Sequence, residues 1–181
     1  MAYKLLSRLA DTVGDGTGTK SATGDYDGDP TIFKIRAKPT EQIIIYRMLV
    51  HMEAASFANS DQYGSGPALA NGIALYVADN DGVIQYYLTD PSHPVTANGE
   101  WAHQCYDYAH FDTQFGAGSE YAAVRWTFAK SGKPVELLPG WSICVLCEDD
   151  LTLGTRGLVE HQFMMQGYYE QPRIGDEEGH A

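Results

Sequence analysis

The chain has 181 residues, with 24 acidic and 12 basic side chains and a formal net charge of −12. This length suffices for one domain with a sizeable core, and 44% hydrophobic and 12% aromatic residues are typical of a globular chain inclined to β-structure. The acidic balance argues against a protein that coats nucleic acid or binds an anionic membrane surface. No stretch approaches the roughly 20 apolar residues that cross a bilayer. The first residues also lack the apolar core of a secretory signal, so we expect synthesis in the cytoplasm.

The first thirty residues are predicted to form an extended arm. Residues 4–10, KLLSRLA, have the spacing of one or two helical turns in which Leu5, Leu6 and Leu9 share a face. The tract that follows, GDGTGTKSATGDYDGDP, is too rich in glycine and aspartate to bury much apolar surface by itself. A partner surface or the wall of its own domain must therefore order it. We expect regular structure to begin near Thr31.

From that point the pattern favours about eight β-strands. They are expected at 31–37, 42–53, the two arms of a hairpin within 73–88, 121–129, 135–138, 141–148 and 158–169. In 42–53, alternate residues from Ile44 to Met52 form one unbroken apolar face. Residues 79–82, DNDG, supply the turn chemistry that a tight hairpin needs.

The last expected strand has a clear alternation. It should place Val159, Phe163, Met165 and Tyr169 inward, and Glu160, Gln162 and Gln166 outward. Residues 90–120 lack periodicity and are expected to form long ordered loops, with one short strand or helical turn around 101–108.

No long amphipathic helix separates the expected strands. An all-β, antiparallel β-sandwich of jelly-roll type is therefore the predicted fold. We divide the chain into an extended N-terminal arm at 1–30, a β-sandwich domain at 31–170 and a flexible acidic tail at 171–181.

The glycine-rich tract matches two ligand motifs incompletely. A P-loop needs a glycine directly before its Lys-Ser pair, where this chain has Thr19. Asp25, Asp27 and Asp29 have the spacing of the first three ligands of an EF-hand loop, but a proline and an arginine occupy the positions that need glycine and glutamate. A looser calcium site on these aspartates remains an open alternative.

The three cysteines, Cys105, Cys144 and Cys147, are too few and too uneven for a disulfide framework. Cys144 and Cys147 form a C-x-x-C pair within a strand-like run. Residues three apart on a strand point to opposite faces, so these thiols cannot converge on one metal ion. We predict reduced core cysteines.

The aromatic segment 101–112, WAHQCYDYAHFD, concentrates polar groups that could form a Cys-His dyad or a metal site. No glycine elbow presents Cys105, and no second ligand pair occurs at a fixed spacing. A loop that covers one end of the sandwich or forms a contact surface is therefore favoured. His51 and His161 are interpreted as surface or core-edge residues. We predict no catalytic residues, no cofactor, no metal and no enzyme activity.

Three segments resemble small virion structural proteins of tailed bacteriophages. They are DTVGDGTGTKSATGDYDGDPTIFKI, YAAVRWTFAKSGKPVELLPG and LVEHQFMMQGYYE, and the resemblance spans about residues 11–170. It implies a β-sandwich on the virion, most often a capsid decoration (cement) protein that binds the outside of an assembled head. The implied partner is the major capsid protein, and the implied assembly is a homo-oligomer, with a trimer favoured.

On this hypothesis the protein is made in the host bacterial cytoplasm and resides on the capsid surface, without nucleic-acid or membrane partners. The expected contact residues are Leu5, Leu6, Leu9, Tyr26, Trp101, Tyr106, Tyr108 and Phe111. Two alternatives stay open. One is a tail or head-to-tail connector component. The other is a carbohydrate-binding jelly-roll module or a cupin-like enzyme, with His103 and His110 as metal ligands.

Overall fold

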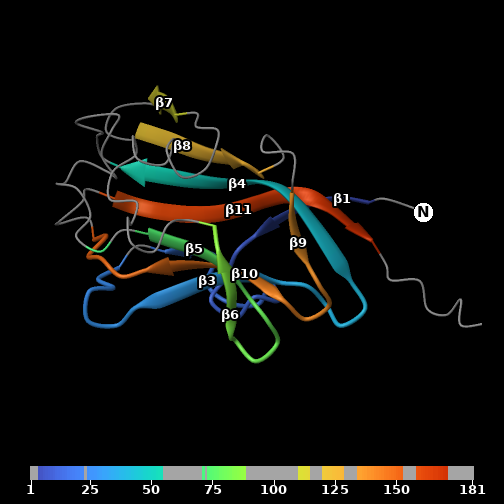
Figure 1. Cartoon of the computed structure of the whole chain (residues 1–181). Helices are drawn as coiled ribbons and strands as arrows, with labels where there is room; N and C mark the ends of the chain where they lie inside the picture. Colours follow the sequence, from blue (N-terminus) through green and yellow to red (C-terminus); the bar gives the residue numbers. More distant parts are fainter. Residues whose placement is uncertain are drawn as a thin grey trace, which may run out of the picture.

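The computed structural model describes residues 4–22, 24–54, 71, 73–88, 110–114, 120–128, 134–152 and 158–170. Within these ranges eleven β-strands form two antiparallel sheets that lie face to face (Figure 1). The described ranges contain no α-helix, and therefore none long and apolar enough to cross a membrane. The predicted all-β sandwich is confirmed at this level.

The larger sheet has the order β1-β11-β4-β8-β7. These strands are β1 Lys4–Leu9, β11 Leu158–Glu170, β4 Gln42–Ala54, β8 Glu120–Thr127 and β7 His110–Gln114. Two short strands extend this sheet: β2, Ser21–Ala22, pairs with β11, and β9, Val135–Leu137, pairs with β4.

The smaller sheet has the order β3-β10-β5-β6. Its strands are β3 Thr31–Arg36, β10 Ser142–Cys147, β5 Ile73–Ala78 and β6 Ile84–Tyr87. Along the chain, the connections from β3 to β4, from β9 to β10 and from β10 to β11 each pass from one sheet to the other. Segments distant in sequence therefore lie on the same face of the molecule.

The core lies between the sheets and takes alternate side chains from both. Its largest fully buried members are Phe33, Ile35, Ile43, Ile45, Met48, Leu75 and Phe163. Each such side chain contributes about 1.5–3 kcal/mol when it is removed from water. This burial is the main reason that strands with period-two patterns pair in this register.

The inward face of β4 changes partway along the strand. Ile43 and Ile45 lie in the core, and so does Met48. The register with β11 skips one residue of β4 at Tyr46. A β-bulge of this kind moves the alternation by one residue. The predicted unbroken face that begins at Ile44 is therefore wrong in its first half.

The outer side of the bulge has its own packing. The Tyr46 ring lies 5.3 Å from the Tyr168 ring, centroid to centroid. Next to this pair, Gly167 faces the backbone of Ile44, and a Cβ at this glycine would overlap the Ile44 carbonyl oxygen. The close approach of β4 and β11 therefore requires glycine at this position.

The alternation of β11 is confirmed where its side chains are described. Phe163 and Met165 are fully buried, while Gln162 and Gln166 lie half-buried on the opposite side. The side chains of the other residues predicted to alternate here lie outside the described part.

His161 is fully buried, so its assignment to the surface or core edge is wrong. Its imidazole lies edge-on to the rings of Tyr26, Phe33 and Phe163, with centroids 6.2, 5.5 and 5.2 Å away. Within the described structure neither ring nitrogen has a hydrogen-bond partner. Burial lowers the pKa of His161 to about 4, so the imidazole is neutral at pH 7.

The predicted helical turns at 4–10 are wrong, because these residues form β1, and regular structure begins well before Thr31. Strand β1 pairs with β11 from Lys4 opposite Tyr169 to Leu9 opposite Met164. An isolated helix of this length is marginal in water. Residues 4–9 therefore adopt the strand conformation that allows them to pair with β11. The extended arm is not confirmed, since residues 4–22 and 24–30 contain several segments paired with the domain itself.

The hairpin within 73–88 is confirmed as β5 and β6. Asp79 Oδ1 accepts hydrogen bonds from the amides of Asp81 and Val83, both at 3.0 Å. Gly82 has a φ of 82°, which glycine adopts without strain. In the region expected to be loops, β7 pairs with β8, and the predicted short element at 101–108 lies outside the described residues.

The prediction of core cysteines is confirmed for two of the three. Both thiols of β10 are free and buried, and they point to opposite faces: Cys147 into the main core, Cys144 into a small cluster with Tyr76 and Ala78. Burial raises the pKa of Cys144 to about 11 and raises that of Cys147 still further. Neither is a reactive thiolate at neutral pH. Cys105 lies outside the described residues.

The close approach at Gly167 gives a first test. We expect Gly167→Ala to lower the free energy of unfolding by about 1–3 kcal/mol, because the added methyl group must push β4 away from β11. Gly28→Ala is the matched control, since no heavy atom lies within 4 Å of a Cβ placed there. Urea denaturation measures both variants, and equal losses of stability would contradict the packing argument.

The buried imidazole gives a second test. The unfolded chain protonates His161 below a pKa near 6.5, whereas the folded chain does so only near 4. Between these values the unfolded state binds more protons, so stability falls as the pH falls. We expect the wild type to lose about 3 kcal/mol more than His161→Phe between pH 7 and pH 4. Equal pH slopes in urea denaturation would show that the imidazole is not desolvated.

Candidate functional site

The loop after β1 is organised around one buried carboxylate. Asp11 is 1% exposed, and it accepts hydrogen bonds from the amides of Val13 at 2.7 Å, Gly14 at 2.6 Å and Gly16 at 2.5 Å. The φ angles of Gly14 and Gly16, 94° and 92°, let their amides turn toward this carboxylate. The glycine-rich composition of the segment therefore serves a defined loop.

The same loop is bound to the edge of β3. Asp11 and Lys34 exchange two backbone hydrogen bonds, of 3.1 and 2.8 Å, and the amide of Arg36 donates to the carbonyl of Gly14 at 2.8 Å. Since β1 belongs to the larger sheet and β3 to the smaller one, residues 4–14 join the two sheets along one side of the sandwich.

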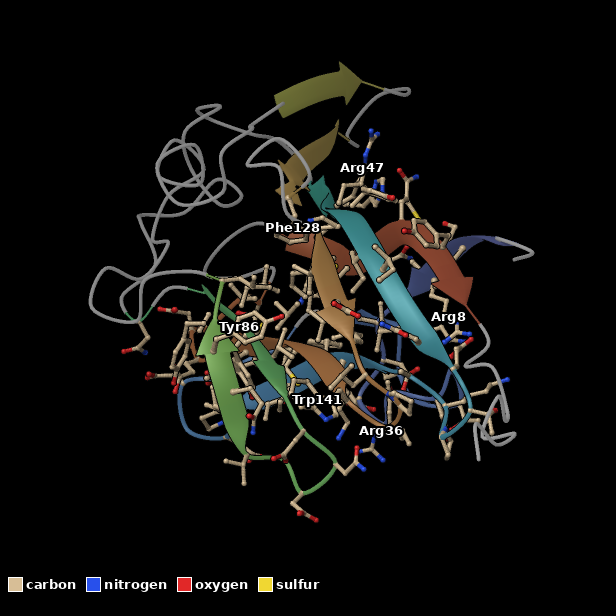
Figure 2. The ribbon with its side chains drawn as sticks, turned by 45° about the vertical axis from the view of Figure 1, so that its right-hand side comes forward. Arg8, Arg36, Arg47, Tyr86, Phe128 and Trp141 are labelled. Carbon is tan, nitrogen blue, oxygen red and sulfur yellow. The ribbon has the colours of Figure 1, made fainter. Side chains whose placement is uncertain are left out.

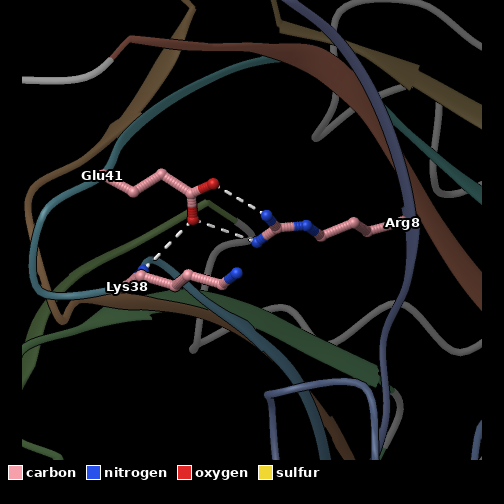
Figure 3. Close-up of polar contacts among 3 residues, drawn as sticks. All are labelled: Arg8, Lys38 and Glu41. Atoms are coloured by element: carbon pink, nitrogen blue, oxygen red, sulfur yellow. Dashed lines mark hydrogen bonds and ion pairs between the residues drawn. The ribbon is translucent and has the colours of Figure 1, made fainter.

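An ion pair holds β1 to the turn between β3 and β4. The guanidinium of Arg8 donates to both carboxylate oxygens of Glu41, at 2.7 and 3.2 Å, and the amide of Lys38 donates to the same carboxylate at 3.2 Å (Figure 3). Glu41 is only 6% exposed. A two-pronged pair of this type fixes orientation as well as distance.

A pocket of about 570 Å³ lies between these elements. We call it the basic pocket; it is lined by residues 7–9, 14–16, 20 and 35–39. Four lining residues are cationic, Arg8, Lys20, Arg36 and Lys38, against the single carboxylate of Asp15. A chain with only 12 basic residues thus places a third of them around one cavity.

The charges of the basic pocket are unequally compensated. Arg8 is paired with Glu41, and Arg36 Nε donates to Ser142 Oγ at 3.4 Å. Hydrogen bonds from Thr17, with a smaller contribution from the Arg36 charge, lower the pKa of Asp15. The side chains of Lys20 and Lys38 make no ion pair with any described residue. An anion in this pocket would meet positive charge from several directions.

Among the residues that the structure describes, no group of three His, Cys, Asp or Glu side chains is placed to hold a metal ion. Of the three aspartates of the possible calcium site, Asp25 accepts the amide of Asp27 at 3.1 Å, and its backbone bridges to Asp150. These contacts give that segment a structural role as a turn at the domain wall.

A second surface feature lies at the end of the smaller sheet. Strand β6 is the last strand of this sheet in the described structure, and all four of its residues are exposed. We define the apolar edge as Val83, Ile84, Tyr86, Tyr87 and Leu138, whose exposed fractions lie between 41% and 58%. Tyr86 pairs with Val77 and Tyr87 with Tyr76, so these two rings point to opposite faces of the strand. Large apolar side chains exposed on the last described strand of a sheet favour a contact surface.

A cavity of about 460 Å³ adjoins the apolar edge, lined in part by Tyr86, Leu138 and the half-buried Trp141. Burial, with a smaller contribution from Glu136, raises the pKa of Tyr86, so its hydroxyl stays neutral. In Figure 2, Tyr86 of the apolar edge lies well apart from Arg8 of the basic pocket.

The structure places the predicted contact residues in different environments. Leu6 is half-buried against the core, and Leu9 lines the basic pocket. Tyr26 is a core residue with 8% exposure, so it is not available as a surface contact in this chain.

The remaining predicted contact residues are not tested. Leu5 and Phe111 lie in β1 and β7, with side chains outside the described part, and Trp101, Tyr106 and Tyr108 lie outside the described residues altogether.

The sequence prediction missed both surface features. The basic residues of the pocket are scattered between positions 8 and 38, so no local run marks them. The sequence contains a weak indication of the apolar edge. It predicts β6 as a strand, and apolar residues on both faces of that strand mean that at least some of them can be exposed.

No protein-family model matches this chain, and no curated protein sequence matches it either.

The role of Asp11 can be tested within its own loop. We expect Asp11→Ala to lower the free energy of unfolding by about 1–3 kcal/mol, because three loop amides lose their acceptor. Asp15→Ala is the matched control: its carboxylate is exposed and accepts hydrogen bonds from the amide and hydroxyl of Thr17, so we expect a change within about 0.5 kcal/mol. Similar urea midpoints for the two variants would show that the loop does not depend on Asp11.

Proposed function

We propose that this chain is a non-enzymatic virion structural protein, a capsid decoration (cement) protein that stabilises the head of a tailed phage. In this proposal the domain is a jelly roll that binds the major capsid protein from outside and assembles as a homo-oligomer, with a trimer favoured. The location is the capsid surface.

The strand orders support the jelly-roll assignment. A jelly roll has two four-stranded antiparallel sheets built from two Greek keys, and it recurs in viral capsid proteins. The orders β1-β11-β4-β8 and β3-β10-β5-β6 fit this scheme, with the first and last strands of the chain adjacent in one sheet. Strands β2, β7 and β9 are then additions to the eight-stranded unit.

The apolar edge is the observation that carries the proposal. Tyr86 and Tyr87 offer large, rigid and amphipathic contact area, the kind of surface that dominates binding energy at protein interfaces. Among the described strands none pairs with the outer edge of β6, and an exposed strand edge with apolar side chains can pair with another chain. A capsid lattice repeats such a contact many times, so each copy needs only a modest interface.

The charge of the chain is compatible with this role. A net charge of −12 opposes nonspecific aggregation of the protein before it reaches the head. The contact itself would rest on apolar and aromatic area.

The proposal is tested by binding the full-length chain to purified heads that lack it, followed by sedimentation. We expect Ile84→Asp and Tyr86→Asp each to weaken binding by roughly tenfold or more. Val13→Asp is the matched control, because Val13 is equally exposed, at 47%, but lies in the loop after β1. Undiminished saturation of heads by both edge variants would contradict the proposal.

Copy number in the intact particle separates this function from the alternatives. Many copies distributed over the head support decoration, whereas a single ring at the neck or tail would assign the chain to a connector. Binding of glycans by the isolated protein, or turnover of a small molecule, would replace the proposal with a carbohydrate-binding or enzymatic function.

A further inference from the structure

We propose that the basic pocket binds the acidic C-terminal segment of the same chain, with the carboxylates of Asp176, Glu177 and Glu178 as ligands. This inference is independent of the decoration function, because it concerns a different surface from the apolar edge. Residues 171–181 lie outside the described residues, so the argument rests on the pocket, on the sequence of the segment and on the point where β11 ends.

Charge complementarity is the first argument. The pocket gathers four cationic side chains in a chain of net charge −12, and two of them, Lys20 and Lys38, have no ion-pair partner among the described residues. The acidic segment offers three consecutive carboxylates. A nucleic-acid phosphate would also meet these cations, but the acidic remainder of the molecule would repel a polyanion of that size.

The position of the strand end is the second argument. Strand β11 ends at Glu170, which pairs with Gln42 at the start of β4. Gln42 follows the turn that carries Lys38, and the neighbouring Glu41 is the partner of Arg8. The chain therefore leaves the sheet beside the rim of the basic pocket.

The reach of the segment is sufficient. Glu170 lies about 5 Å from Gln42 across the strand pair, and Lys38 is four positions before Gln42 along the chain, so the strand end and Lys38 are at most roughly 20 Å apart. Asp176 is six residues beyond Glu170, a span that also reaches roughly 20 Å when extended. The carboxylates can therefore enter the pocket without any change in the sheets.

The pocket also suits a short peptide in size and lining. Its volume of about 570 Å³ lies within the usual range for ligand sites. Leu9, Ile35 and Pro39 provide apolar wall between the cations, and Ile174 gives the segment an apolar side chain next to its acidic run. Binding within one chain also gains from a high effective concentration.

Carbodiimide cross-linking of the full-length protein tests the inference, because this reagent joins a lysine amine to a carboxylate in direct contact. Trypsin cuts after Arg173 and releases residues 174–181, so a cross-link appears as this peptide attached to Lys20 or Lys38. We expect these two lysines to carry the dominant products. Products at Lys4 or Lys34 in place of them, or none with residues 174–181, would overturn the proposal.

A charge-reversal variant controls for lysine reactivity. Arg36→Glu leaves both lysines and the segment chemically intact, and we expect it to lower the cross-link yield by about fivefold. Arg47→Glu is the matched control, since Arg47 lies on β4 far from Arg36 in Figure 2, and its yield should stay within twofold of the wild type. Far-UV circular dichroism checks that both variants are folded. Equal yields in the two variants would contradict a role for the pocket charges.

Mixed isotopes establish that the contact forms within one chain. A mixture of ¹⁵N-labelled and unlabelled protein should give cross-linked peptides that are fully labelled or fully unlabelled. Hybrid products in statistical proportion would show that a neighbouring copy supplies the segment, and would overturn the intrachain form of the proposal.

Discussion

Pairing of the first strand with the last is the interaction on which most of this structure depends. Strand β11 lies between β1 and β4, so it connects the start of the chain to the centre of the larger sheet. Because β1 is held there, the loop after it reaches β3 and joins the second sheet. The basic pocket exists only because these contacts bring residues 7–20 against residues 35–39. Without β1 on β11, the pocket would lose one of its walls.

Buried polar side chains in this fold differ in whether they have hydrogen-bond partners. The carboxylates of Asp11 and Glu41 are buried, and each accepts several hydrogen bonds, so they contribute order to the loops around them. His161 is equally buried, but its nitrogens have no partner within the described structure, and the rings of Tyr26, Phe33 and Phe163 pack edge-on to it. The imidazole stays neutral because desolvation penalises its cation. The stability of the folded chain therefore falls as the pH drops below the pKa of His161 in the unfolded chain.

The two surface features follow from how a sandwich ends. At one side the loop after β1 closes the gap between the sheets and gathers cations from three separate segments. At the end of the smaller sheet β6 has no described neighbour beyond it, and all four of its residues are exposed. Within its described residues, a chain of net charge −12 thus carries a localised positive cavity and a localised apolar surface.

The sequence by itself determined the class of the fold and most of its strands. Period-two patterns mark β4 and β11, the DNDG turn marks the hairpin, and the strand character of residues 141–148 places Cys144 and Cys147 on opposite faces. These features are local, because side-chain alternation and turn chemistry depend on neighbours in the chain. Only the tertiary structure decided that residues 4–9 are a strand, that β4 changes face at Tyr46, and that His161 is a core residue. Each of these depends on a partner strand far away in sequence, and the pocket cations, scattered between residues 8 and 38, become one site only after both sheets have formed.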